Sequence, residues 1–296
     1  MDRLDCLSAF VAVADQGGFA IAARHLRVSP PAVTRAVAAL EGRLGVTLFH
    51  RTTRSVRLTE DGAAFLPRCR QALSDLRDAE EAAMGPRAEP RGTLAVTAPV
   101  LFGRMHVAPV VAELLCRHPL LSVRLVLLDR MVNLVDEGFD VAVRIGALAD
   151  SALSSIRVGE ARRVLVASLA YLEANGTPGS ARDLGKHAVI AFTGVSASDT
   201  WQVAARGSAA HVRPRLVVND ADAAISAAVA GLGITRVLSY QVSADLAAGR
   251  LQTVLDQDAG AAMPVSLLFQ SARKGAPNVR AFVELAKTCL QAATLC

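Results

Sequence analysis

The sequence predicts a multidomain α+β protein with a helical N-terminal segment, one long helix and a C-terminal α/β region. Apolar residues recur at helical spacing through residues 4–44, and a second helical pattern runs without interruption from 59 to about 84. After a linker rich in proline and glycine at 85–92, strand-like runs alternate with helical runs, which favours α/β units. A chain of 296 residues has room for two or three such domains.

The composition is that of a globular protein, with 52% hydrophobic and 20% charged residues and a net charge of +5. The five cysteines are scattered and no Cys/His cluster has zinc-site spacing, so we expect reduced thiols and no metal. The chain starts with charged residues where a secretory signal needs apolar ones, and no apolar run is long enough to cross a bilayer. We therefore expect a cytoplasmic protein without a membrane partner.

The first three helical patterns are joined in the manner of a helix-turn-helix. The first has an apolar face made of Leu4, Leu7, Phe10, Val11 and Ala14. After two glycines, a short helix over 19–26 leads into a two-residue turn, and Ser29 stands at an N-cap position ahead of two prolines. The third helix reaches about residue 44. It leaves small and basic groups exposed near its start, as does a recognition helix that enters a major groove.

A basic hairpin follows the third helix. Two short strands over 46–50 and 55–58 enclose the tip Arg51-Thr52-Thr53-Arg54 and predict a wing. Residues 21–58 contain seven arginines and a single acid, Glu41, a local net charge of +6 that would attract DNA phosphates. We therefore predict that residues 1–58 form a winged helix-turn-helix that binds double-stranded DNA. Two alternatives remain open: the arginines only keep a helical domain soluble, or they bind DNA without sequence preference.

The long helix carries a possible dimerisation seam. Thr59 fits an N-cap, with Glu60 and Asp61 in the first turn. Apolar residues then recur at alternating steps of four and three, the a/d pattern of a coiled coil: Phe65, Cys69, Ala72, Leu76, Ala79 and Ala83. The alternative is an ordinary amphipathic helix that lies on its own domain. For Cys69, a buried inert thiol is favoured over a redox switch.

These residues resemble the N-terminal pattern of the LysR-type transcriptional regulators (LTTR). The matching positions include Leu4, Phe10-Val11-Ala12-Val13-Ala14, Ser29-Pro30-Pro31-Ala32-Val33-Thr34-Arg35, Leu40-Glu41, Leu44-Gly45, Leu48-Phe49, Leu58-Thr59 and Gly62. Beyond the linker the likeness continues in Gly92-Thr93-Leu94, Gly138-Phe139-Asp140-Val141-Ala142-Val143-Arg144, Asn219-Asp220 and Gly231-Leu232-Gly233. The family often has Ser where this chain has Gly18 and Ser or Thr where it has Ala20, and many members have Gln at Pro30.

The resemblance implies a specific domain organisation and a dimer. It implies a winged helix-turn-helix at 1–58, a dimerising linker helix at 59–85, a hinge at 86–91 and an effector domain at 92–296, built like periplasmic binding proteins. Lobe one of that domain would comprise 92–162 and 267–296, and lobe two 163–266, with crossover strands at 163–167 and 265–269. It also implies a homodimer or a dimer of dimers (a homotetramer) that binds an approximate inverted repeat and contacts RNA polymerase.

The resemblance also assigns site residues. The DNA contacts would come from Ser29, Pro31, Thr34 and Arg35 on the recognition helix and from Arg51 and Arg54 on the wing. A small organic anion would bind between the lobes against Thr97, Ala98, Pro99, Val100, Gly146, Ala147, Phe192, Thr193, Asn219 and Asp220.

An enzyme finds little support. The sequence has no GxSxG, HExxH, Walker A or GxGxxG motif, and its six histidines lack ligand spacing. We therefore expect no catalytic residue and no cofactor. A solute-binding or transport-type module is the remaining alternative, because the C-terminal part resembles one, although the basic N-terminal segment speaks against it.

Overall fold

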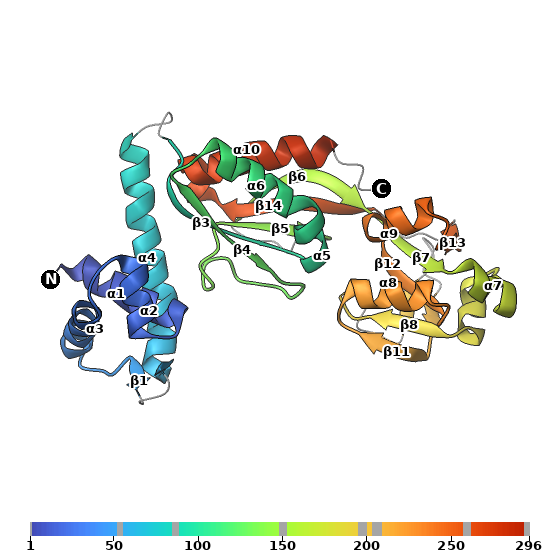
Figure 1. The fold of residues 1–296 in the computed structure, drawn as a ribbon, viewed down its shortest axis with the longest axis horizontal. Helices are drawn as coiled ribbons and strands as arrows, with labels where there is room; N and C mark the ends of the chain where they lie inside the picture. The colour runs from blue at the N-terminus through green and yellow to red at the C-terminus, as the bar shows by residue number, and fades with distance from the viewer. Residues whose placement is uncertain are drawn as a thin grey trace. The chain divides into compact units, whose positions relative to one another are not determined.

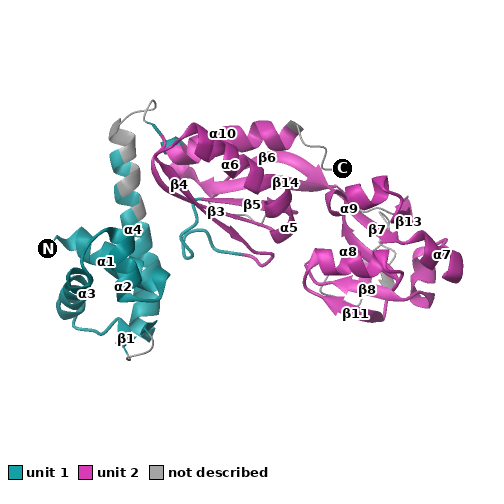
Figure 2. Cartoon of the chain, in the orientation of Figure 1, with its two compact units in different colours: residues 1–89, 132–140, 275–277 teal, residues 90–131, 141–274, 278–296 magenta. Residues whose placement is uncertain are grey.

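The structure is a computed structural model of the chain (Figure 1). It describes residues 2–51, 56–84, 89–147, 153–194, 200–202, 209–256 and 262–292. The chain divides into two compact units (Figure 2). The first comprises residues 1–89, 132–140 and 275–277, and the second comprises residues 90–131, 141–274 and 278–296.

The first unit is a three-helix domain with a small hairpin and a long helix. Its elements are α1 (Arg3–Gln16), α2 (Phe19–Leu26), α3 (Pro30–Leu44), β1 (Phe49–Arg51), β2 (Val56–Leu58) and α4 (Glu60–Met84). Asp2 caps α1 in a capping box, and Gly17 and Gly45 end α1 and α3 with φ of 66° and 72°. Glycine suits both positions because a side chain disfavours the left-handed conformation.

The core of this unit is formed by apolar side chains of the three helices, but the buried face of α1 differs from the predicted one. Of the five predicted residues only Phe10 is buried, Leu7, Val11 and Ala14 are half-buried, and Leu4 is exposed, while Cys6, Ala9, Ala12 and Val13 are buried instead. Phe10, Val37 and Leu40 are at most 1% exposed. The ring centroid of Phe10 lies 5.3 Å from that of Phe49 on β1, so the wing shares the core of the helices. Helix α4 adds Leu66 to the same cluster. Thus the wing and the base of α4 fold together with the helix-turn-helix.

The second unit contains two five-stranded sheets, which we call lobe one and lobe two. In lobe one the strand order is β4-β3-β5-β14-β6. Its elements are β3 (Gly92–Ala98), α5 (Val100–Phe102), the π-helix η1 (Gly103–Val107), α6 (Ala108–Arg117), β4 (Leu121–Leu127), β5 (Val141–Ile145), β6 (Leu153–Ala161), β14 (Met263–Gln270), η4 (Ser271–Gly275) and α10 (Pro277–Ala292). Strand β3 is parallel to β4 and β5, whereas β14 is antiparallel to β5 and β6.

In lobe two the strand order is β11-β8-β12-β7-β13. Its elements are β7 (Arg163–Ala167), α7 (Leu169–Asn175), η2 (Ala181–Lys186), β8 (Val189–Phe192), β9 (Thr200–Gln202), β10 (Ala209–His211), β11 (Pro214–Val218), α8 (Ala221–Val229), β12 (Ile234–Leu238), α9 (Ser239–Ala247) and β13 (Gln252–Val254). Strand β8 is parallel to β11 and β12. Trp201, which is 1% exposed, packs in a cluster with residues from β7, α7, β8 and β12.

The chain crosses between the lobes at Arg162. Strand β6 ends at Ala161 in the sheet of lobe one, and β7 begins at Arg163 in the sheet of lobe two. The Ser239 N–H donates to the carbonyl oxygen of Arg162 at 2.8 Å, and Arg162 N–H donates to Ser239 Oγ at 3.1 Å. The return crossing precedes β14, all of which pairs in lobe one. Residues 263–266 therefore belong to the lobe-one sheet, whereas the sequence-based boundary at 267 assigns them to lobe two.

Candidate nucleic-acid interface

Helix α3 presents its N-terminal half to solvent. The turn before it is tight because Arg27 adopts the left-handed conformation (φ 57°) and its N–H donates to the carbonyls of Ala23 and Arg24. Ser29 occupies the N-cap, but its side chain makes no capping hydrogen bond, so the hydroxyl is available to another acceptor or donor. Pro31 lies beside it in the first turn of the helix and is exposed.

Two further predicted contact residues lie on the same exposed stretch of α3. Thr34 Oγ1 donates to the carbonyl oxygen of Pro30 at 3.1 Å, and Thr34 is exposed. Arg35 is also exposed, and its guanidinium has no hydrogen bond or ion pair within the described part of the chain. The four predicted residues of the recognition helix are therefore brought together on one solvent-facing stretch.

The wing differs from the sequence-based expectation in the place of Arg51. The prediction put Arg51 at the tip after a strand over 46–50, but it is the last residue of β1, where it pairs with Val56. Its Nη2 donates to Glu41 Oε2 at 2.7 Å, and its guanidinium carbon lies 4.7 Å from the ring centroid of Phe19. Arg54 lies outside the described residues.

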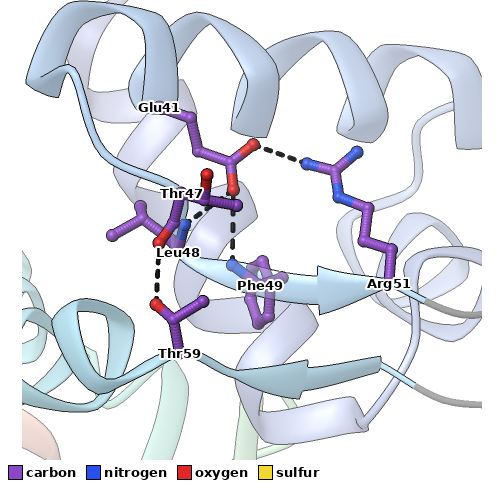
Figure 3. Close-up of polar contacts among 6 residues, drawn as sticks. All are labelled: Glu41, Thr47, Leu48, Phe49, Arg51 and Thr59. Carbon is purple, nitrogen blue, oxygen red and sulfur yellow. Dashed lines mark hydrogen bonds and ion pairs between the residues drawn. The ribbon is translucent and has the colours of Figure 1, made fainter.

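Glu41 connects the recognition helix to the wing (Figure 3). Its Oε1 accepts the backbone N–H groups of Leu48 at 2.8 Å and Phe49 at 3.3 Å, while Oε2 binds Arg51. A carboxylate that accepts from backbone donors and a guanidinium forms charge-assisted hydrogen bonds, which are stronger than neutral ones. This role of Glu41 was not predicted, although Glu41 is the single acid beside seven arginines in residues 21–58.

The start of α4 continues the same network. Thr59 Oγ1 accepts the N–H of Gly62 at 2.9 Å, which confirms the predicted N-cap, and donates to the carbonyl oxygen of Thr47 at 2.7 Å. The Thr59 N–H donates to the carbonyl oxygen of Leu48 at 3.0 Å. Thr59, the N-cap of the long helix, is thus hydrogen-bonded to Thr47 and Leu48, which directly precede β1 and which we call the root of the wing.

The predicted dimerisation seam is divided between two environments. Cys69 is 2% exposed and Phe65 packs on the core of the unit, 5.8 Å from the Phe10 ring. Arg70 and Asp15 form an ion pair that also holds α4 against α1. In contrast, Ala72, Leu76 and Ala79 are exposed, and the side chain of Ala83 lies outside the described residues. The first part of α4 therefore lies on its own domain, and only the later seam residues are open to a partner.

The ten predicted effector residues share one kind of position. They lie at or directly after the carboxyl ends of strands β3 and β5 in lobe one and of strands β8 and β11 in lobe two. Because β3 is parallel to β5 and β8 is parallel to β11, both groups lie at one edge of their sheets. Ligands of open α/β sheets bind at that edge.

Their exposure differs, however. Thr97, Ala98 and Phe192 are buried, and Thr97 Oγ1 has no hydrogen-bond partner among the described residues. Pro99 and Gly146 are half-buried, while Val100, Ala147, Thr193, Asn219 and Asp220 are exposed.

Two of these residues already take part in hydrogen bonds between a backbone N–H and a carboxylate of the chain itself. The Val100 N–H, where a ligand carboxylate could bind, donates to Asp129 Oδ1 at 3.0 Å. Asp220 caps α8 by accepting the Ala223 N–H at 3.0 Å. Any ligand that binds here would therefore meet Asp129 as a neighbour. No metal-binding group of three or more His, Cys, Asp or Glu side chains occurs in the part of the chain that the structure describes.

Both units match models of one protein family. Residues 4–63 match the bacterial regulatory helix-turn-helix protein of the lysR family, and residues 87–290 match the LysR substrate binding domain. This chain belongs to the LysR family of transcriptional regulators. Regulators of this family bind DNA through the helix-turn-helix, bind small-molecule effectors and form oligomers. No described helix of this LysR-family chain is long and apolar enough to span a membrane.

Named relatives cover nearly the whole LysR-family chain. The HTH-type transcriptional regulator CrgA of Neisseria meningitidis is 31% identical over 280 residues, 94% of each chain. The transcriptional activator AaeR of Escherichia coli is 32% identical over 271 residues, 91% of this chain and 88% of its own. A transcriptional repressor of Pseudomonas aeruginosa is 33% identical over 287 residues, 96% of this chain and 90% of its own.

Solved structures show the same fold. The structure of CrgA superposes with a TM-score of 0.63 at 30% identity and covers 98% of this chain and 99% of that chain. A full-length OxyR variant from Pseudomonas aeruginosa has a TM-score of 0.73 at 15% identity, covers 100% of this chain and 96% of that chain, and supports the fold alone.

Proposed function

We propose that this LysR-family regulator recognises a specific DNA sequence with the exposed start of α3. Ser29, Pro31, Thr34 and Arg35 would contact DNA in the major groove, while Arg51 and Arg54 would place the wing beside the backbone. The observation that carries the proposal is the exposed Arg35 guanidinium, which has no partner in the described part of the chain. Arginine in this position can bind a guanine edge through two hydrogen bonds.

We also propose that the regulator works as a homodimer or a dimer of dimers. Ala72, Leu76 and Ala79, with Ala83, would form the helix contact, because they follow the part of α4 that packs on its own domain. Two copies of α3 would then read the two halves of an approximate inverted repeat. Light scattering of the full chain at several concentrations measures the assembly directly, and a monomer at micromolar concentration would refute this part.

The proposed effector is a small organic acid that binds at the carboxyl ends of the lobe strands. The ten residues assigned by resemblance support this, because strand ends from both sheets contribute to the set. Binding must favour one arrangement of the lobes if it is to change the spacing of the DNA-binding domains. We propose that this change alters DNA bending or the contact with RNA polymerase in the cytoplasm.

The test compares Arg35→Ala with the wild-type chain on the DNA that flanks its own gene and on unrelated DNA of equal length. Loss of a bidentate base contact costs about 1–3 kcal/mol, so cognate affinity should fall by roughly 5- to 150-fold while binding to unrelated DNA changes little. Arg215→Ala is the matched control, because Arg215 is an exposed arginine on β11 in the other unit. Its affinities should equal those of the wild-type chain.

Each other outcome points to a specific alternative. Equal losses on both DNAs would make Arg35 a phosphate contact, and equal wild-type affinities would indicate DNA binding without sequence preference. If the wild-type chain binds neither DNA at moderate ionic strength, a solute-binding or transport-type module becomes the better assignment. Footprints with and without a panel of organic acids test the effector, and identical footprints and bend angles throughout would refute it.

A further inference from the structure

We infer that Glu41 is a positioning residue that locks the wing to the recognition helix, so that α3 and β1 meet DNA as one rigid body. This inference rests on the proposed function of the first unit as a DNA reader. It is carried by contacts that join three elements: Glu41 on α3, Arg51 on β1 and Phe19 on α2.

The carboxylate of Glu41 satisfies backbone donors that water cannot reach. Leu48 and Phe49 are 0% and 2% exposed, and their N–H groups donate to Glu41 Oε1 at 2.8 and 3.3 Å. A buried donor that loses its acceptor incurs its full desolvation cost. This side chain therefore helps to hold Leu48 and Phe49 at a fixed distance from the recognition helix.

Arg51 completes the connection from the wing side. Its Nη2 donates to Glu41 Oε2 at 2.7 Å, and its guanidinium carbon lies 4.7 Å from the centre of the Phe19 ring. The side chain of Arg51 is 36% exposed, and that of Glu41 only 15%. Arg51 thus contacts α2 through Phe19 and the recognition helix α3 through Glu41. Its charge is partly neutralised by Glu41.

Phe19 links this arrangement to the core. Its ring centroid lies 5.8 Å from that of Phe49 in an edge-on contact, and Phe49 in turn packs against Phe10. A displacement of the wing would break the stack of Arg51 on Phe19 and the edge contact together. The geometry therefore resists motion of β1 relative to α2 and α3.

The direction in which Glu41→Gln changes the affinity for cognate DNA distinguishes a positioning role from a purely electrostatic one. Removing a negative charge beside DNA should by itself strengthen binding to every sequence. If Glu41 positions the wing, Glu41→Gln should instead weaken cognate binding by about tenfold, because the amide NH2 cannot pair with Arg51, while binding to unrelated DNA stays equal or rises. The ratio of the two affinities is the measured quantity.

Glu60→Gln is the matched control. Glu60 is an exposed acid in the first turn of α4, in the same unit, and removing its charge breaks no hydrogen bond or ion pair within the described residues. It should leave the affinity ratio unchanged. If Glu41→Gln raises both affinities as Glu60→Gln does, the inference is wrong.

A second variant covers the case in which Glu41→Gln fails to fold. Arg51→Lys keeps the charge but replaces the planar fork by a point charge that cannot bind Glu41 and stack on Phe19 as well. If Arg51 positions the wing, this variant should have a lower ratio of cognate to unrelated DNA affinity, while the salt dependence of DNA binding stays unchanged. A pure phosphate contact predicts wild-type affinity for this variant, since lysine also binds phosphate, and that result would overturn the inference.

Hydrogen exchange of the full chain without DNA keeps this inference separate from the proposed function. In Glu41→Gln, the amides of Leu48 and Phe49 should exchange at least about threefold faster, because their acceptor is weakened, while those of α1 stay unchanged. Unchanged exchange would refute the positioning role even if the wild type binds DNA specifically. Faster exchange in a protein that ignores DNA would support the contact and refute only the proposed function.

Discussion

Gly62 lies where α4 passes the root of the wing, and a methyl group there should destabilise the DNA-binding unit. A Cβ at this position would lie 3.1 Å from the carbonyl carbon of Leu48 and 3.1 Å from Leu58 Cδ2, and still closer to the Leu48 carbonyl oxygen. The backbone of Leu48 cannot move away freely, because its N–H is held by Glu41 and its C=O by Thr59. The clash must therefore shift α4 itself.

The magnitude for Gly62→Ala follows from two opposing terms. Overpacking a tight contact costs about 1–3 kcal/mol, and a rigid backbone neighbour favours the upper end. Alanine in a helix gains about 1 kcal/mol over glycine. The net loss of about 2 kcal/mol corresponds to a fall of roughly 10 °C in the melting temperature of a unit of this size. Calorimetry of the full chain measures the fall, and hydrogen exchange of N-terminal peptides assigns it to the first unit.

Gly42→Ala provides the matched control on a neighbouring helix. Gly42 is exposed on α3, and a Cβ there would meet nothing within 4 Å. Only the helix propensity acts, so this variant should gain up to about 1 kcal/mol. The two glycine-to-alanine changes should therefore move the stability in opposite directions. A Gly62→Ala protein as stable as the wild type would refute the close approach of α4 to the wing.

Two further predictions concern titratable groups whose pKa is shifted by burial. His106, whose ring lies 4.8 Å from Phe102 and 5.5 Å from Tyr240, has a pKa that burial lowers from 6.5. His106 therefore binds a proton more readily in the unfolded chain than in the folded unit. The free energy of unfolding should fall as the pH drops below about 6.5. Urea denaturation at about pH 7.5 and 5.5 checks this, and a drop equally large in His106→Gln would contradict it. Burial raises the pKa of Cys69 to about 11, so iodoacetamide at about pH 8 should label exposed Cys116 and spare Cys69. Peptide mass spectrometry measures both sites, and fast labelling of Cys69 would place it outside the core.

Much of the DNA-binding unit could be predicted from local patterns. Helices over Phe19–Leu26 and Pro30–Leu44 follow from apolar spacing, and the N-cap positions of Ser29 and Thr59 follow from residue type, although the Thr59 side chain makes a capping hydrogen bond and that of Ser29 does not. The lobe strands were harder to predict one by one, because the sequence shows only a general alternation of strand-like and helical runs after residue 92. Strand β8 is buried over its whole length, and such a strand needs no alternation of apolar and polar residues, whereas β6, β11 and β13 lie at the edges of their sheets and are partly exposed.

The sequence by itself determined the family, the order of the DNA-binding and effector domains and the concentration of arginines before residue 58. Tertiary structure alone decided that Arg51 pairs with Glu41 and that Cys69 faces its own core. Caps and helical faces depend on residues three or four positions apart, and these can be read along the chain. Which side chains meet across elements depends on how the helices pack, and a residue pattern along one helix does not specify its neighbour.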